Sequence, residues 1–216
     1  MDGLPEWFPT HRHDPAFWEA LGRAVGTFGF LEEILGKAIF AFTATRRYGN
    51  NAELQQAYDE WLPKLERALT DPLGNLIEAY GKAVHEHTEE NIANADDLLA
   101  ELRKASDIRN VLCHGSWQSP DANGASLPLF VNRQKLIFDT AIDRQFLLRV
   151  QQHTAKLACA VMNTVTTMGW RFPGSAGPGI SIDVASVSTC SDILPGRASD
   201  NRYDFPIQQL APTTPA

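Results

Sequence analysis

The sequence predicts an all-α protein: an up-and-down bundle of four main helices, with a small β-hairpin before the last helix and an irregular C-terminal tail. Apolar residues recur at spacings of three and four over long stretches, which is the pattern of one buried helix face. The connections between these stretches are short, and long helices joined in this way pack best antiparallel. At 216 residues and 44% hydrophobic composition, the chain can bury one sizeable core.

The first helix is expected to start at Asp14, as N-cap, with Pro15 at the first helical position. It is expected to end at "RRYGNN", residues 46–51, where cations in the last turn precede a glycine. A second helical region runs from about Ala52 to Val84, interrupted at Pro63 and at "TDPLG", residues 70–74. The third helix is expected from near Glu89 to His114.

The remaining elements follow a turn-rich stretch. Two short strands, "LPLFVN" and "KLIFD", predict the hairpin, and Thr140 with Asp143 suggests a capping box for a fourth helix, roughly Asp143 to Met168. From Trp170 onward the chain is rich in Gly, Pro, Ser and Thr. We therefore divide it into an N-terminal extension (1–13), a helical bundle (14–169) and a tail (170–216).

Composition restricts the classes of function. The net charge of -7 argues against a protein that coats nucleic acid broadly, because such binding needs clustered cations. The three cysteines occur singly, without the spacing of a disulfide framework or a zinc site. The N-terminus does not resemble a signal peptide, and no stretch is apolar for long enough to span a membrane. We expect a cytoplasmic protein.

The third helix carries an arginine on its apolar side. Arg109 falls within the predicted buried stripe, where a guanidinium is costly unless an acceptor meets its donors. Glu32 lies on the apolar face of the first helix and is the expected partner. The buried stripe consists of Leu98, Leu102, Ala105, Ile108 and Leu112.

A second stripe of the same helix contains Asp107, Asn110 and His114, with Arg103 one turn earlier. Asn110 is expected to hydrogen-bond His114 and fix its tautomer, while Asp107 biases the region electrostatically. Because a helix C-terminus favours a cation, His114 is expected in both protonation states near neutral pH, as proton transfer requires.

Simpler interpretations compete with a catalytic one. His114 can merely cap the helix that Gly115 ends, and Arg109 can pair structurally with Glu32. Cys113 is expected to face the apolar side as an inert thiol. The histidines of "HRH", residues 11–13, and "HEH", residues 85–87, lack a third metal-ligand motif, so exposed loop or helix-end positions are expected and no metal site is predicted.

The stretch "RNVLCHG", residues 109–115, resembles the signature of HEPN domains, all-helical bundles in which an arginine and a histidine are separated by a short gap. The residue after the arginine is often Asn, Asp or His in that family, and Asn110 matches. The continuation through "HGSW", a turn, two short strands and a final helix is similar to a subgroup of small bacterial HEPN proteins. The resemblance covers residue 107 to about residue 168.

The resemblance implies metal-independent RNA cleavage, without a cofactor, to a 2′,3′-cyclic phosphate in a cleft shared by two copies of the chain. His114 would be the general acid or base, Arg109 would hold the phosphate, and Asn110 would orient the histidine or contact the phosphate. The protein would be a toxin or defence effector, with an antitoxin or regulatory protein as a further partner. The alternative is a non-catalytic dimeric helical module that binds a partner protein or nucleotide.

Other residues have secondary roles in this interpretation. Asp107, Glu32 and Arg103 are the candidate supporting residues around the motif. Trp117 can stack on a base, although an aromatic that closes the end of the bundle is the commoner case. Lys104 is the nearest lysine that could contact RNA, among scattered cations that also include Arg46, Arg47 and Arg133.

Overall fold

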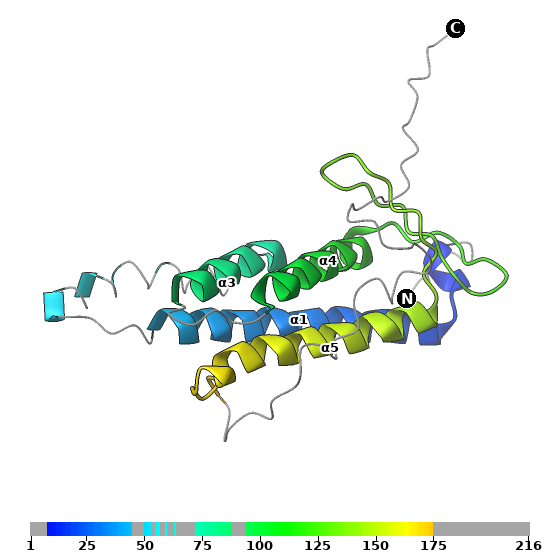
Figure 1. Ribbon diagram of the computed structural model, residues 1–216. Coiled ribbons are helices and arrows are strands. Elements are labelled where there is room, and N and C mark those ends of the chain that lie inside the picture. Colours follow the sequence, from blue (N-terminus) through cyan, green and yellow to red (C-terminus); the bar gives the residue numbers. More distant parts are fainter. Residues whose placement is uncertain are drawn as a thin grey trace, which may run out of the picture.

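The structure, a computed structural model, describes residues 8–44, 50–52, 55–56, 59, 63, 72–87 and 94–174. These residues are mostly helical, as predicted. A 3-10 helix, η1 (Pro9–Arg12), precedes the long helices, which are α1 (Pro15–Ala44), α3 (Leu73–His87), α4 (Ala95–His114) and α5 (Arg144–Thr167). The helices form two layers, with α1 beside α5 in one and α3 beside α4 in the other (Figure 1).

The helices alternate in direction from α3 onward. Arg103 of α4 pairs with Glu78 of α3, and Asp96 pairs with His85, so α3 and α4 are antiparallel. α5 returns against α4 and runs in the same direction as α1 (Figure 1). α1 and α3 also run in the same direction (Figure 1). In the predicted up-and-down bundle of four helices, these two would be antiparallel. The connection between them contains the predicted breaks, and α3 begins directly after Pro72, where a proline ring is compatible with a helix start.

The starts of three helices test the predicted caps. The Asp14 carboxylate accepts a hydrogen bond from the Ala16 amide at 2.7 Å, which confirms the start of α1. At α5 the cap is Asp143, whose Oδ1 accepts from the Phe146 amide at 2.6 Å, so the capping box starting at Thr140 is wrong. α4 begins at Ala95, directly after Asn94, whose left-handed backbone (φ 66°) does not continue a helix; the predicted start near Glu89 lies outside the described residues.

Some predictions fall outside the described residues. The described part of α1 ends at Ala44, and most of its expected end at residues 46–51 falls on residues 45–49, which are not described. Of the predicted tail, residues 170–174 are described: Phe172 is buried, and the Trp170 ring lies 6.0 Å from that of Phe42. The remainder of the tail, residues 175–216, is outside the description.

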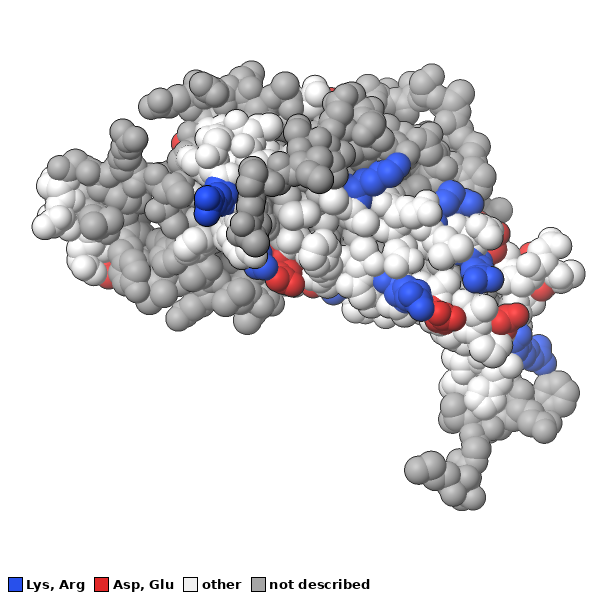
Figure 2. Space-filling view, turned by 90° about the horizontal axis from the view of Figure 1, so that it is seen from below, with Lys and Arg blue, Asp and Glu red and all other residues white. Residues whose placement is uncertain are grey.

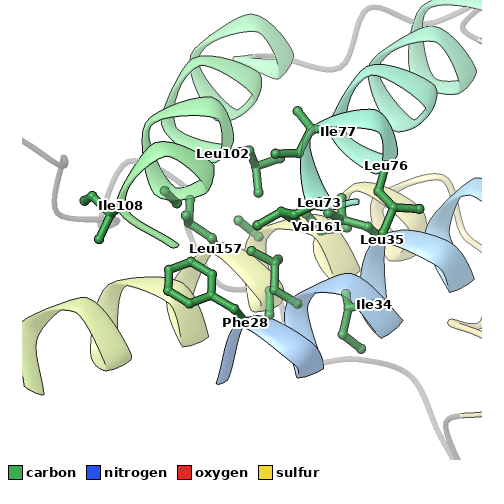
Figure 3. Close-up of a cluster of buried hydrophobic side chains, with 14 of the residues drawn as sticks. Phe28, Ile34, Leu35, Leu73, Leu76, Ile77, Leu102, Ile108, Leu157 and Val161 are labelled. Carbon is green, nitrogen blue, oxygen red and sulfur yellow. The ribbon is translucent and has the colours of Figure 1, made fainter. Parts of the chain in front are cut away.

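The core lies between the two helix layers. Leu102 of α4, Ile77 of α3, Phe28 of α1 and Leu157 of α5 are almost completely buried and meet in one cluster (Figure 3). Burial of each such side chain contributes about 1.5–3 kcal/mol. The predicted stripe of α4, Leu98 to Leu112, is buried as expected. The core therefore fixes which face of α4 points inward and which residues remain at its edge.

The connection between α4 and α5 folds back on itself twice without forming strands. Isolated antiparallel bridges join Ser116 to Leu129, Ser126 to Ile142 and Val131 to Ile137. The two predicted strands are joined by the bridge between Val131 and Ile137, but no β-hairpin of regular strands is present among residues 94–174. Both turns of the connection project from the end of the bundle where α1 and α5 begin (Figure 1).

The charged surface is mixed. On the face seen in Figure 2, Lys and Arg side chains are scattered, several beside acidic ones, and they do not merge into a continuous basic patch over the described atoms. None of the described helices combines the length and the apolar character that crossing a bilayer needs.

Candidate functional site

Gly115 determines how α4 ends. Its backbone is extended, with φ -69° and ψ 138°, so the glycine is not required by a left-handed conformation. A Cβ at this position would lie 2.6 Å from the Val111 carbonyl oxygen and 2.9 Å from Cβ of Pro128. Only glycine therefore allows the backbone at residue 115 to lie this close to Val111 and Pro128. The helix ends at His114 because the backbone of Gly115 is extended.

Arg109 lies at the edge of the core. Its Nη2 is 3.5 Å from Oε1 of Glu32 on α1, and the two side chains are 25% and 30% exposed. The predicted pair is thus confirmed, in a position that solvent reaches. The Nη1 group makes a second long contact, 3.5 Å to Oδ1 of Asn110. A guanidinium has five N–H donors, so two contacts of this length leave it capacity to bind an anion.

Asn110 and His114 do not interact as expected. The Asn110 carbonyl oxygen turns to Arg109 instead of to the histidine one turn later. The imidazole of His114 is exposed and has no hydrogen bond or ion pair to any described residue. The expectation that Asn110 fixes the histidine tautomer is therefore wrong, and the ring is available to a ligand.

Asp107 lies two turns before His114 on the same side of α4. Partial desolvation of its carboxyl group raises its pKa above the ordinary value of 3.8. Within the part of the chain that the structure describes, the carboxylate has no cationic partner that would offset this effect. Asp107 is thus not held by an ion pair to a described residue, and its electrostatic effect on His114 stays a prediction.

The other two cations of α4 are engaged with carboxylates. Arg103 forms a bidentate contact with Glu78 of α3, at 2.8 and 3.2 Å, and its hydrogen bond lowers the pKa of Glu78. Lys104 lies 2.8 Å from Oε1 of Glu101, whose other oxygen is 3.7 Å from Nε2 of the buried His153 on α5. Lys104 is also about 15 Å along the helix axis from His114.

Trp117 is part of an aromatic cluster. Its ring is 5.2 Å from Phe17, edge to face, and 6.3 Å from Trp18. His13 joins the cluster, stacked on Phe17 at 4.7 Å and only 5% exposed, so the expectation of an exposed histidine fails at this position. His13 lies four residues before Phe17, and this spacing could have indicated its burial. The cluster supports the interpretation of Trp117 as an aromatic that closes the bundle end.

Two further expectations concern cysteine and metal. Cys113 is exposed and not buried, because it follows the inward-facing Leu112 and a step of about 100° turns it away from the core. Among the described residues, no group of three or more His, Cys, Asp or Glu side chains could hold a metal ion. In "HEH", His85 contacts Asp96 at 3.2 Å; the side chain of His87 is outside the description.

Comparisons of the chain with known protein families, with curated proteins and with solved structures found no match. The resemblance of residues 109–115 to the HEPN signature therefore depends on the motif itself and on its position at the end of α4.

Proposed function

We propose that this chain is a metal-independent endoribonuclease of HEPN type, a toxin or defence effector, whose cleft is shared by two copies. The observation that carries the proposal is the contrast at the end of α4. His114 is exposed without a described partner, and Arg109, five residues earlier, is held by only two long contacts. On a regular helix these residues are separated by roughly 140° and about 7.5 Å of rise, enough to border one phosphate.

The proposed reaction is transesterification within RNA. The ribose 2′-oxygen forms a bond to the adjacent phosphorus, and the bond from phosphorus to the 5′-oxygen breaks, which leaves a 2′,3′-cyclic phosphate. His114 of one copy removes the proton of the 2′-hydroxyl, and His114 of the other gives a proton to the departing 5′-oxygen. Arg109 stabilises the charge that develops on the phosphate oxygens.

Glu32 and Asn110 position the guanidinium of Arg109 in this proposal. Their oxygens each approach one Nη group, so they restrict the orientation of the guanidinium fork. Fixing this group before the substrate binds lowers the cost of reorganisation during the reaction. Asn110 therefore positions Arg109 in this proposal, in place of the role toward His114 that the sequence suggested.

A second function is favoured by a different observation. Glu32 already balances part of the Arg109 charge, and the net charge of the chain is -7. Both features suit a non-catalytic dimeric helical module that binds a partner protein or a nucleotide at this end. The two functions differ in whether RNA is cut.

The test is incubation of the purified chain with RNAs of mixed sequence in the presence of a chelator. We expect cleavage products that end in a cyclic phosphate, and losses of at least about 100-fold in rate for His114→Ala and for Arg109→Ala. Arg103→Ala is the matched control, because that arginine pairs with Glu78 away from the helix end.

Two results would contradict the proposal. Cleavage that persists at the wild-type rate in both variants would exclude Arg109 and His114 from the mechanism. A wild-type chain that cuts none of the RNAs would instead favour the non-catalytic module.

A further inference from the structure

The solvent side of α1 carries two exposed aromatic side chains. Phe30 is 45% exposed and Phe40 is 37% exposed, and they are the only large hydrophobic side chains exposed on the described parts of α1, α3, α4 and α5. Lys37, seven residues after Phe30, points within about 20° of the same direction on a regular helix, and Phe40 follows one turn later. We call these three residues the outer stripe of α1.

The chain that follows α5 crosses α1 and reaches the outer stripe. The ring of Trp170 lies 6.0 Å from that of the buried Phe42. At Gly174, a Cβ would lie 3.5 Å from Nζ of Lys37 and 3.9 Å from its Cε. Between these two contacts the chain passes from Phe42 to Lys37, which is about 7.5 Å back along α1 and roughly 140° around it. At residue 174 the chain has therefore reached the solvent side of α1 and moved toward the start of that helix.

Two isoleucines follow Gly174 at a distance that suits Phe30. The next five residues, "SAGPG", have only small side chains or proline, and Ile180 and Ile182 come after them. Six residues of extended chain span at most about 20 Å, whereas Phe30 is about 10.5 Å along the helix axis from Lys37. Ile180 can therefore reach Phe30 even if the glycines and the proline bend the chain. In an extended backbone, Ile180 and Ile182 lie on the same side.

A segment of the same chain suits the outer stripe better than a second molecule. Two phenylalanines and one lysine stem offer far less than the ~1,000 Å² of buried surface that a stable interface between separate molecules needs. A tethered segment needs much less, because the tether keeps it at a millimolar effective concentration.

We infer that residues 180–182 dock on the outer stripe of α1, with Ile180 and Ile182 packed against the ring of Phe30. Docking removes this ring from water and fixes the point from which the rest of the tail, residues 183–216, leaves the bundle. The inference does not depend on the proposed function, because neither Arg109 nor His114 takes part in the contact.

The first experiment measures the contact by NMR in the full chain with labelled isoleucine methyl groups. The Phe30 ring should shift the methyl signals of Ile180 and Ile182 upfield, and Phe30→Leu should abolish this shift. Phe40→Leu is the matched control, because Phe40 is exposed to a similar extent but lies about 15 Å from Phe30 along the helix. Circular dichroism confirms that both variants are folded. Unshifted methyl signals in the wild-type chain, or a shift that Phe30→Leu leaves intact, would overturn the inference.

A mixture of labelled and unlabelled chains distinguishes the tail of the same chain from a second copy. Nuclear Overhauser effects from the methyl groups of Ile180 and Ile182 to the ring of Phe30 should arise within one chain and be independent of protein concentration. Effects that join a labelled chain to an unlabelled one would assign the outer stripe to a second copy and would also overturn the inference.

The third experiment tests the proximity of the two segments with a disulfide. In a background of Cys113→Ser and Cys190→Ser, Phe30→Cys with Ile182→Cys should form an intrachain disulfide in oxidised glutathione. The rate should be at least about tenfold higher than for Gln152→Cys with Ile182→Cys. Gln152 is the matched control: it is exposed on α5, about as far from the end of that helix as Phe30 is from the described end of α1, and both helices end at the same end of the bundle (Figure 1). Equal rates would contradict docking on α1.

Discussion

The cationic side chains in the two halves of α4 differ in how closely their partners approach them. In the first half, Arg103 has a bidentate partner at 2.8 and 3.2 Å, and Lys104 has a carboxylate at 2.8 Å. In the second half, both contacts of Arg109 are 3.5 Å long, and His114 has no described partner. In α4, the cations of the first half thus have carboxylate partners at short distance, whereas Arg109 and His114 near the C-terminal end do not.

This difference indicates which charged residues are candidates for function. A cation with short, geometrically matched partners gains little from a ligand, because the ligand would have to displace them. A guanidinium with long contacts, or an imidazole with none, can gain hydrogen bonds when an anion arrives. Arg103 and Lys104 therefore belong to the stabilising surface of the bundle, although sequence pattern placed them with the site.

The largest expected effect separates Arg109 from Arg103. Arg109→Lys keeps the charge but removes the planar fork, and we expect RNA cleavage to slow about 100-fold, the cost of losing an oriented donor to the transition state. Arg103→Lys should leave the cleavage rate unchanged. Initial rates on a labelled RNA measure both. Equal slowing by the two substitutions would break the comparison between the halves of the helix.

Gly115 tests whether the end of α4 is held by close packing. Gly115→Ala should lower the free energy of unfolding by about 1–3 kcal/mol, because the new Cβ would collide with the Val111 carbonyl and with Pro128. Gly26→Ala is the control: Gly26 is in α1 with no described atom within 4 Å of a Cβ, so alanine should stabilise by about 0.5–1 kcal/mol. Urea unfolding measures both. A neutral Gly115→Ala would remove the packing argument.

A smaller effect is expected in the first half of the helix. Glu78→Gln removes the partner of Arg103, and because both side chains are exposed the loss should be under about 1 kcal/mol at pH 7. The pKa of Glu78 is lowered from 4.5 in the folded chain, so the contribution of the pair is present above that pH and is lost as pH falls through the folded pKa. Unfolding measured from pH 7 to pH 3 should show the variant and wild type converging. A constant difference would contradict the assigned cause.

The smallest effect has the opposite sign. The raised pKa of Asp107 means that the folded state binds a proton more readily than the unfolded chain, so stability falls as pH rises above 3.8. Asp107→Asn should therefore stabilise slightly at pH 7, by less than about 0.5 kcal/mol, as for other surface changes. The gain should disappear below pH 3.8. Destabilisation at pH 7 would indicate that the carboxylate has a favourable partner.

Much of the fold follows from local patterns in the sequence. The apolar spacing identified the core faces of α1 and α4, and the Asp14–Pro15 pair identified the start of α1 correctly. The sequence did not indicate the parallel relation of α1 and α3, because helix direction depends on the path of the connection and not on the periodicity of either helix. Likewise, Asp143 and Thr140 both suit a cap, and only the backbone geometry decides between them.

The candidate site was predicted less completely. The Glu32–Arg109 pair was predictable because each residue interrupts an apolar face, and a buried charge requires an opposite charge. The partner of Asn110 was not predictable, because Arg109 and His114 are both within reach of its side chain. The burial of His13 was indicated by its spacing of four residues from Phe17, whereas the exposure of Cys113 depends on a rotation of one residue around the helix, which an apolar pattern does not resolve.

The most direct test of the central claim is a titration of the isotope-labelled chain with an RNA whose 2′-oxygens are methylated, so that it binds without being cut. NMR follows the side-chain Nε–H signals of Arg103 and Arg109 and the imidazole signals of His114. We expect the signals of Arg109 and His114 to shift together along one binding curve while the signal of Arg103 does not move. A shift of Arg103 without Arg109 and His114, or no shift at the end of α4 at any RNA concentration, would contradict it.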